Sequence, residues 1–210
     1  MPMTKAETPQ RKGRKLEQVL DGAREIFLRD GFEGASVDDI ARAAGVSKAT
    51  LYSYFPEKRL LFVEVARREC LRQADAALEL VQLSAPPEVI LPLAAERIID
   101  FFLSEFGRRV FRICVAESDR FPELGQQFYE SGPVLVRNRI AAYLTCAVSR
   151  GELVIDDIDL AADQFAELCK ADIFSAVIFG VRRTFTEADR NRVITGAVEM
   201  FLARYRTGAS

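Results

Sequence analysis

Two short helices joined by one glycine, within residues 36–56, constrain the fold of this chain more than any other feature. Ser36 and Ser47 each stand where a helix N-cap is expected, and Pro56 suits the first position of a following helix. Gly45 separates the two helices, where the chain needs a residue that tolerates positive φ. The small and apolar residues that would pack the pair at a fixed angle are Ile40, Ala41, Ala44, Val46, Leu51 and Phe55. This arrangement predicts a helix-turn-helix of the kind that reads DNA.

Helical patterns continue through most of the 210 residues. Apolar residues recur at i+3 and i+4 spacing, and no segment shows convincing strand alternation, so we expect an all-α fold of about nine helices. The first helix is expected to begin near Lys15 and to end at Gly31, which suits a C-cap. Residues 1–14 contain prolines and a basic cluster and are expected to form a flexible basic arm. Longer helices are expected over residues 60–81, 88–105, 109–118, 123–150 (with a break at Gly132-Pro133), 160–180 and 187–205.

The composition excludes most catalytic chemistry. The chain has no histidine, which removes Ser-His, Cys-His and His-metal sites together. It also has neither a glycine-rich phosphate loop nor a paired-carboxylate motif. We therefore expect a protein that is not an enzyme and that binds no cofactor and no metal.

The cysteines and the apolar runs indicate the compartment. Cys70, Cys114, Cys146 and Cys169 form no CxxC pair, and each has apolar neighbours. They are expected to be small buried residues in a reducing cytosol, with a redox-sensing thiol left open. The N-terminus lacks the apolar segment of a secretory signal, and the longest apolar run falls far short of the roughly 20 residues of a membrane span. The protein is expected to be soluble and cytoplasmic, with no membrane contact.

The second short helix carries a surface that a purely structural helix does not need. Its polar residues are Ser47, Lys48, Thr50, Tyr52, Ser53 and Tyr54. Hydroxyls and free amides at a helix N-terminus bind phosphate, and Thr or Tyr also contacts thymine methyl groups. Lys58 begins the next helix, within reach of the adjacent DNA backbone, and is predicted to contact phosphate. These residues favour a DNA-reading role for the helix.

Residues 15–65 resemble the DNA-binding domain of the TetR/AcrR family of transcriptional regulators. The resemblance lies in Ile26–Phe32, Ser36-Val37-Asp38-Asp39-Ile40-Ala41 and the segment from Ala44 to Lys58. Residues 111–117, 121–133 and 150–153 are similar to the C-terminal domains of the AefR-like branch. By position, the family's DNA contacts fall on Ser36, Val37, Ser47, Lys48, Ala49, Thr50, Tyr52, Ser53, Tyr54 and Lys58. Ala49 stands where a glycine is often found, which leaves its role open.

The resemblance implies a homodimer that binds a palindromic double-stranded DNA operator, usually as a repressor, and that a small molecule releases. We accordingly divide the chain into the arm (1–14), the helix-turn-helix domain (15–60) and an effector-binding and dimerisation domain (61–210). A second possibility is a dimeric helix-turn-helix protein with no effector, acting as an activator or an architectural protein. The identity of an effector does not follow from the sequence.

Two sets of apolar residues in the C-terminal part are candidates for these roles. Wide stripes on the last two predicted helices suggest a four-helix dimer interface. The residues of the predicted interface are Phe165, Cys169, Ile173, Ala176, Ile194, Ala197 and Phe201. The residues of the predicted apolar ligand pocket are Phe101, Phe102, Phe106, Phe111, Phe128, Tyr143 and Phe174. Ordinary core packing is the alternative for both sets.

The charge balance first argues against DNA binding. Lys and Arg number 29 against 31 Asp and Glu, for a net charge of −2 and a pI of about 5.5. That total averages two unlike parts, because residues 1–72 hold 14 basic against 11 acidic residues and residues 73–210 hold 15 against 20. The arm together with Lys15 carries a net +4, since residues 1–15 hold five basic residues and one Glu. The chain is therefore polarised, and the arm is expected to add non-specific backbone or minor-groove affinity.

Overall fold

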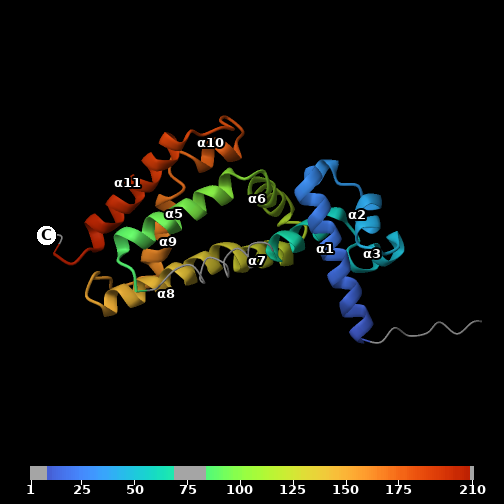
Figure 1. The fold of residues 1–210 in the computed structure, drawn as a ribbon, viewed down its shortest axis with the longest axis horizontal. Coiled ribbons are helices and arrows are strands. Elements are labelled where there is room, and N and C mark those ends of the chain that lie inside the picture. The colour runs from blue at the N-terminus through green and yellow to red at the C-terminus, as the bar shows by residue number, and fades with distance from the viewer. Residues whose placement is uncertain (1–8, 69–83, 209–210) are drawn as a thin grey trace, which may run out of the picture. The chain divides into compact units, whose positions relative to one another are not determined.

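The computed structural model describes residues 9–68 and 84–208 (Figure 1). Within these ranges the chain forms ten α-helices, one π-helical turn and a further helical segment at residues 58–68, which confirms the all-α prediction. The single β-type pairing among the described residues is an isolated bridge between Leu153 and Arg206. The predicted helix 60–81 falls partly outside the described residues. No helix in the described ranges is long and apolar enough to cross a membrane.

The chain divides into two compact units, Met1–Glu69 and Cys70–Ser210. The first unit extends beyond residue 60, where the sequence placed its end. The reason is that the helical segment 58–68 turns its apolar face into the first unit. Leu61 and Phe62 are buried there, and the Phe62 ring meets that of Phe27 edge to face at 5.0 Å.

The first unit is built from α1 (Pro9–Gly34), α2 (Val37–Ala43), α3 (Lys48–Tyr54) and the segment 58–68. Helix α1 crosses the end of α2 so closely that a Cβ at Gly22 would lie 2.5 Å from the backbone nitrogen of Ala44. Only glycine fits there, because a methyl group would overlap backbone atoms. The buried core of this unit includes Val19, Leu20, Ala23, Ile26, Phe27, Ile40, Ala41, Ala44, Leu51, Leu61, Phe62, Val65 and Ala66.

Helix α1 differs from the sequence prediction at its start. It begins at Pro9 rather than near Lys15, so residues 9–14 of the expected flexible arm form its first turns, and proline is well tolerated in a first turn. Residues 1–8 of the arm lie outside the described residues. Gly31, with a φ of 70° and a ψ of 179°, is not helical, so the first helical run ends where the sequence predicts. A further short helical stretch follows this kink and ends at Gly34.

The second unit contains α5 (Pro87–Leu103), α6 (Glu105–Glu117), α7 (Pro122–Tyr129), the π-helical turn η1 (Glu130–Val134), α8 (Leu135–Ser149), α9 (Ile158–Leu168), α10 (Phe174–Ile178) and α11 (Glu187–Tyr205). Helix α8 packs against α9, and α5 packs against α11. The predicted break at Gly132-Pro133 takes the form of η1, because Pro133 has no N–H to donate to the preceding turn. A continuous path of helix thus runs from α7 into α8.

The predicted helix 160–180 is wrong in its continuity. It stops at Leu168 and resumes at Phe174, and between these residues Asp172 adopts a φ of 63°. Arg192 of α11 forms an ion pair with Asp172 at this break. Positive φ is uncommon in residues other than glycine, but Asp tolerates it better than most. The sequence has no glycine or proline between Leu168 and Phe174, so the helical pattern did not indicate the break.

Candidate nucleic-acid interface

Side-chain caps fix the two helices of the helix-turn-helix. Ser36 Oγ accepts a hydrogen bond from the Asp39 N–H at 3.0 Å, and Ser47 Oγ accepts one from the Thr50 N–H at 3.1 Å. Both predicted N-caps are therefore confirmed. Gly45 has the expected positive φ of 63°. Because each cap satisfies an otherwise unpaired amide, it fixes the residue at which its own helix begins.

Helix α3 exposes most of the side chains predicted to read DNA. Tyr52 is 47% exposed, and Leu51 beside it is 1% exposed and holds the helix to the core. The other predicted contact residues that are exposed are Ser36, Ser47, Lys48, Ala49 and Ser53, and those that are half-buried are Val37, Thr50 and Tyr54. The exposed face of α3 thus combines hydroxyls, one cation and an aromatic ring, the groups that contact phosphates and base edges.

The polar groups of this face already have partners inside the protein. Lys48 forms an ion pair with Asp38 of α2. Ser53 Oγ donates to the Thr50 carbonyl at 2.6 Å, and the Ser47 and Thr50 hydroxyl oxygens lie 2.9 Å apart. Contact with DNA would therefore exchange these local partners for phosphates or base edges.

One acidic residue at the start of α2, Asp39, is held in its charged form. The hydrogen bond from the Ser36 hydroxyl and the ion pair with Arg42 hold the pKa of Asp39 below its ordinary value. Negative charge at this helix N-terminus is favoured by the helix dipole. The edge of the helix-turn-helix next to α3 consequently carries as much negative as positive charge.

Lys58 makes contacts within the protein that the sequence did not predict. Its Nζ donates to the carbonyl oxygens of Phe32 at 2.7 Å and Ala35 at 3.0 Å, and it lies 4.5 Å from the centre of the Phe32 ring. Two of its three N–H donors are therefore used within the protein, and Lys58 joins the end of α1 to the start of the segment 58–68. Its contact with phosphate stays a prediction.

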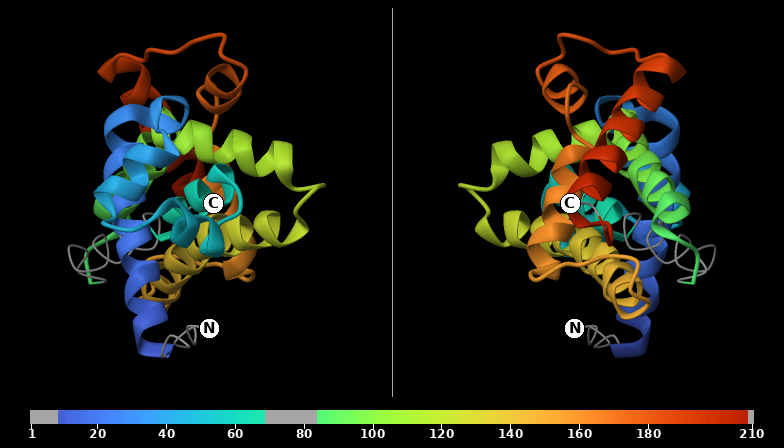
Figure 2. Two further views of the ribbon diagram at one scale, coloured as in Figure 1. Left: turned by 90° about the vertical axis from the view of Figure 1, so that its right-hand side faces the viewer. Right: turned by 90° about the vertical axis from the view of Figure 1, so that its left-hand side faces the viewer.

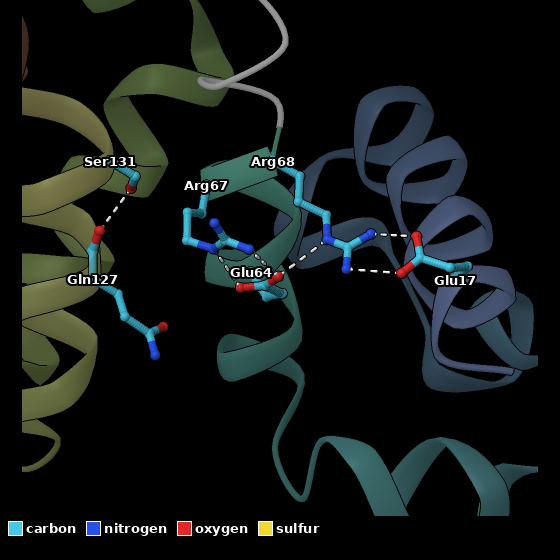
Figure 3. Close-up of polar contacts among 6 residues, drawn as sticks. All are labelled: Glu17, Glu64, Arg67, Arg68, Gln127 and Ser131. Carbon is cyan, nitrogen blue, oxygen red and sulfur yellow. Dashed lines mark hydrogen bonds and ion pairs between the residues drawn. The ribbon is translucent and has the colours of Figure 1, made fainter. Parts of the chain in front are cut away.

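A network of ion pairs joins the other end of that segment to α1 (Figure 3). Arg68 donates to Glu17 of α1 at 3.0 Å and to Glu64 at 3.1 Å, and Arg67 donates twice to Glu64 at 2.8 Å. Burial acts to raise the pKa of Glu64, but the two arginines outweigh it, and the net shift is downward. The i,i+4 spacing of Glu64 and Arg68 is typical of an ion pair on a helix, whereas nothing in the sequence indicates Glu17 as a partner of Arg68.

Five of the seven predicted pocket aromatics form one cluster in the second unit. Phe102 and Phe174 lie at its centre, with ring centroids 4.9 Å apart and nearly perpendicular planes. Phe111 lies 5.0 Å from Phe174, and Phe101 and Phe128 join through Phe102 and Phe111. All five rings are half-buried rather than fully enclosed. The cluster draws on four helices, α5, α6, α7 and α10.

The other two predicted pocket residues are placed differently. Tyr143 is buried in the core between α8 and its neighbours, where its hydroxyl donates to the Ala85 carbonyl at 2.9 Å. Burial raises its pKa to about 12. Phe106 is half-buried on α6. Tyr143 is thus a core residue, and its assignment to a pocket is corrected.

A surface depression of about 670 Å³ lies over α8 and the start of α9. Its lining residues are Asn138, Ala141, Ala142, Thr145, Asp156, Asp157, Ile158 and Asp159. None of the seven predicted pocket aromatics contributes to it. The depression and the phenylalanine cluster are therefore separate features of the second unit.

Most of the predicted dimer-interface residues lie inside the protein's own core. Phe165, Cys169, Ile173, Ala197 and Phe201 are all buried, and the rings of Phe165 and Phe201 meet edge to face at 5.2 Å. They are unavailable to a second subunit, which corrects that part of the prediction. The apolar stripes of the last predicted helices are wide because those helices are buried against other helices of the same chain. Ala176 and Ile194 are half-buried and stay predictions.

Comparison with known proteins agrees with this architecture. Residues 19–65 match the family described as bacterial regulatory proteins, tetR family, and residues 90–207 match the AefR-like transcriptional repressor, C-terminal domain. Among solved structures, a putative TetR-family regulator from Mesorhizobium loti is 28% identical, with a TM-score of 0.79 over 95% of this chain and all of that one. The Flavonoid-responsive Regulator FrrA is 36% identical, with a TM-score of 0.70 over 94% of this chain and all of that one.

Curated relatives match over a part of this chain. The HTH-type transcriptional repressor AcnR of Corynebacterium efficiens is 35% identical over 63 residues, which cover 30% of this chain and 34% of that protein. The match thus spans about a third of the length of this curated relative.

The helix-turn-helix and the helical second unit define a DNA-binding transcriptional regulator rather than an enzyme. The chain belongs to the TetR family, and its C-terminal part is of the AefR-like type.

Proposed function

We propose that the protein is a homodimeric repressor that binds a palindromic operator through α3 and is released by a small aromatic ligand. The observation that carries the DNA-binding part is the capped, exposed α3, with Tyr52 and Lys48 projecting from a helix anchored by Leu51. Recognition helices of this type enter the major groove with their N-terminal residues toward the base edges. A two-fold dimer would present two such helices about 34–36 Å apart, one turn of DNA.

The phenylalanine cluster supports the aromatic class of the ligand. Half-buried rings that already meet edge to face offer further faces and edges to a planar ring. The relative FrrA, which is 36% identical over nearly the whole chain, is named for its response to flavonoids. A flat, polyphenol-like molecule bound at Phe102, Phe111 and Phe174 would bridge α5, α6 and α10, and so would shift helices of the second unit together.

The dimer surface in this proposal uses exposed apolar residues in place of the buried stripe. Leu160 of α9 and Met200 of α11 are 52% and 64% exposed. Phe179 and Val181, which follow α10, are each 82% exposed. Contiguous exposed apolar patches mark interaction sites, and the proposal assigns these four side chains to such a patch.

The test begins with selection of bound duplexes from a random DNA library, followed by fluorescence anisotropy on the selected duplex. We expect a palindromic consensus, a stoichiometry of two chains per site, and release on titration with the flavonoid naringenin. A long-chain fatty acid serves as the non-aromatic control. Absence of any selected sequence would refute the DNA-binding function. Tight binding that neither compound affects would instead favour a helix-turn-helix protein without an effector.

A further inference from the structure

The phenylalanine cluster of the second unit has a cation at its edge. Lys170 lies in the break between α9 and α10, and its Nζ is 5.7 Å from the ring centroids of both Phe102 and Phe174. Helix α10, which carries Phe174, packs against both α5 and α6 (Figures 1 and 2). An ammonium group at this distance is attracted to aromatic rings. A molecule that stacks on these two rings would therefore lie within reach of the Lys170 ammonium.

The charge of Lys170 is balanced by an exposed carboxylate. Lys170 forms an ion pair with Glu167 at the end of α9, and the side chains are 26% and 70% exposed, respectively. Exposed ion pairs contribute little, because water and side-chain entropy oppose them. Glu167 can return to water without leaving a buried charge behind. An acidic group brought in beside the rings could therefore replace Glu167 as the partner of Lys170.

Two further cations of α6 border the elements that carry the cluster. Arg108 donates to the carbonyl oxygen of Leu103 at the end of α5. Arg112 donates to the carbonyl oxygens of Val177 at 3.1 Å and Ile178 at 3.0 Å, at the end of α10. Within residues 9–68 and 84–208 neither arginine forms an ion pair, so carboxylates do not neutralise these two charges. The positive charge stands out because acidic residues outnumber basic ones by 20 to 15 in residues 73–210.

Rings and cations together define the chemistry of a ligand. The half-buried rings offer faces and edges to a planar ring. An oxyanion attached to that ring would accept a charge-assisted hydrogen bond from the Lys170 ammonium, which is stronger than a bond between neutral groups. A neutral aromatic molecule would use the rings alone and would leave Lys170 paired with Glu167.

We infer that Lys170 is a ligand-binding residue that selects an aromatic molecule carrying an ionised acidic group, either a carboxylate or a phenolate. The inference rests on the proposed effector site at the phenylalanine cluster and adds the charge of the ligand to it. On binding, the oxyanion takes the place of Glu167 at Nζ, and Glu167 turns to water. Glu167 thus competes with the ligand. Removal of the Glu167 charge strengthens binding, whereas removal of the Lys170 charge weakens it.

The experiment compares two planar molecules of the same shape, 2-naphthoate and its neutral amide 2-naphthamide. Their binding to the full-length protein is measured by calorimetry near neutral pH, without DNA. Wild type is expected to bind naphthoate about 10–100-fold more tightly than naphthamide, the range for a hydrogen bond to a charged group. K170Q is expected to bind the two molecules equally, and K170R to retain most of the preference because it keeps the charge.

The variant E167Q tests the competition. It is expected to bind naphthoate about 2–5-fold more tightly than wild type, the range for an exposed ion pair. The matched control E152Q removes the carboxylate of another pair in the second unit, Arg150–Glu152, and should leave both affinities unchanged. Circular dichroism checks that all variants keep the helix content of wild type. If K170Q fails to fold, the wild-type comparison and E167Q still decide the inference.

Equal affinity of wild type for naphthoate and naphthamide would overturn the inference, as would a preference that K170Q retains or an equal response of E167Q and E152Q. Binding of the flavonoid naringenin without binding of naphthoate would also overturn it, while leaving the aromatic site of the proposed function intact. Failure of all three compounds to bind would count against that aromatic site itself, and the inference would fall with it.

Discussion

Replacing Lys58 with methionine distinguishes a structural role from a phosphate contact. Methionine keeps the length of the side chain but removes the ammonium, so the Phe32 and Ala35 carbonyls lose their donor. Hydrogen bonds to charged groups contribute about 1.5–3 kcal/mol. Because Lys58 is only half-buried and water can rehydrate the carbonyls, we take about 2 kcal/mol for the pair. The contact with the Phe32 ring adds about 0.5–1 kcal/mol.

The expected loss is therefore about 2–3 kcal/mol in the first unit. Hydrogen exchange is the suitable assay, because it reports on the amides of the first unit alone, whereas a single unfolding transition would average over both units. Amides near the end of α1 and in the segment 58–68 should exchange about 30–150-fold faster, which corresponds to this free energy. Lys48→Met is the matched control, since an exposed ion pair such as Lys48–Asp38 contributes less than about 1 kcal/mol.

Equal exchange rates in the two variants would refute the structural role of Lys58. If Lys58→Met instead leaves exchange unchanged and lowers the salt slope of DNA binding by about 1, the residue contacts phosphate, as the sequence first suggested.

Three further predictions test other parts of the structure. Tyr52→Ala should weaken operator binding, measured by anisotropy, and should leave the helical circular dichroism unchanged because the side chain is 47% exposed. Gly22→Ala should destabilise the first unit by about 1–3 kcal/mol in urea unfolding, since the added methyl overlaps Ala44; wild-type stability would disprove the close crossing. Hydrogen bonds from Thr186 and the Arg182 ion pair lower the pKa of Asp189 from 3.8 to about 2. This stabilisation is present above the ordinary pKa and is lost as the pH falls toward 2, so Asp189→Asn should flatten the acid side of the plot of Tm against pH. An unchanged plot would show that the charge of Asp189 does not stabilise the fold.

Local sequence signals predicted the helix-turn-helix well because its determinants are local. The Ser36 and Ser47 caps act on amides three residues away, and Gly45 sets the backbone of one turn. The presence of helices in the second unit, and most of their ends, follow from the same short-range preferences. The break at Asp172 escaped prediction because the apolar pattern continues across it, while the ion pair with Arg192 comes from a distant helix.

Side-chain roles depended on partners that are remote in sequence. The sequence identified the aromatic residues but did not show that five of them meet while Tyr143 packs elsewhere. It marked Phe165 and Phe201 as an apolar stripe but could not tell an interface from a core, because both bury the same side chains. Whether an apolar stripe is covered by the same chain or by a second subunit depends on how the helices pack.

The sequence by itself determined that this protein is an all-α regulator with a capped, exposed α3, since capping, turn formation and helical periodicity act within a few residues. Only the tertiary structure decided that Lys58 closes the end of α1 and that the predicted dimer stripe is interior. These outcomes depend on contacts between residues far apart in the chain, 26 positions in the case of Lys58 and Phe32, which no local preference encodes.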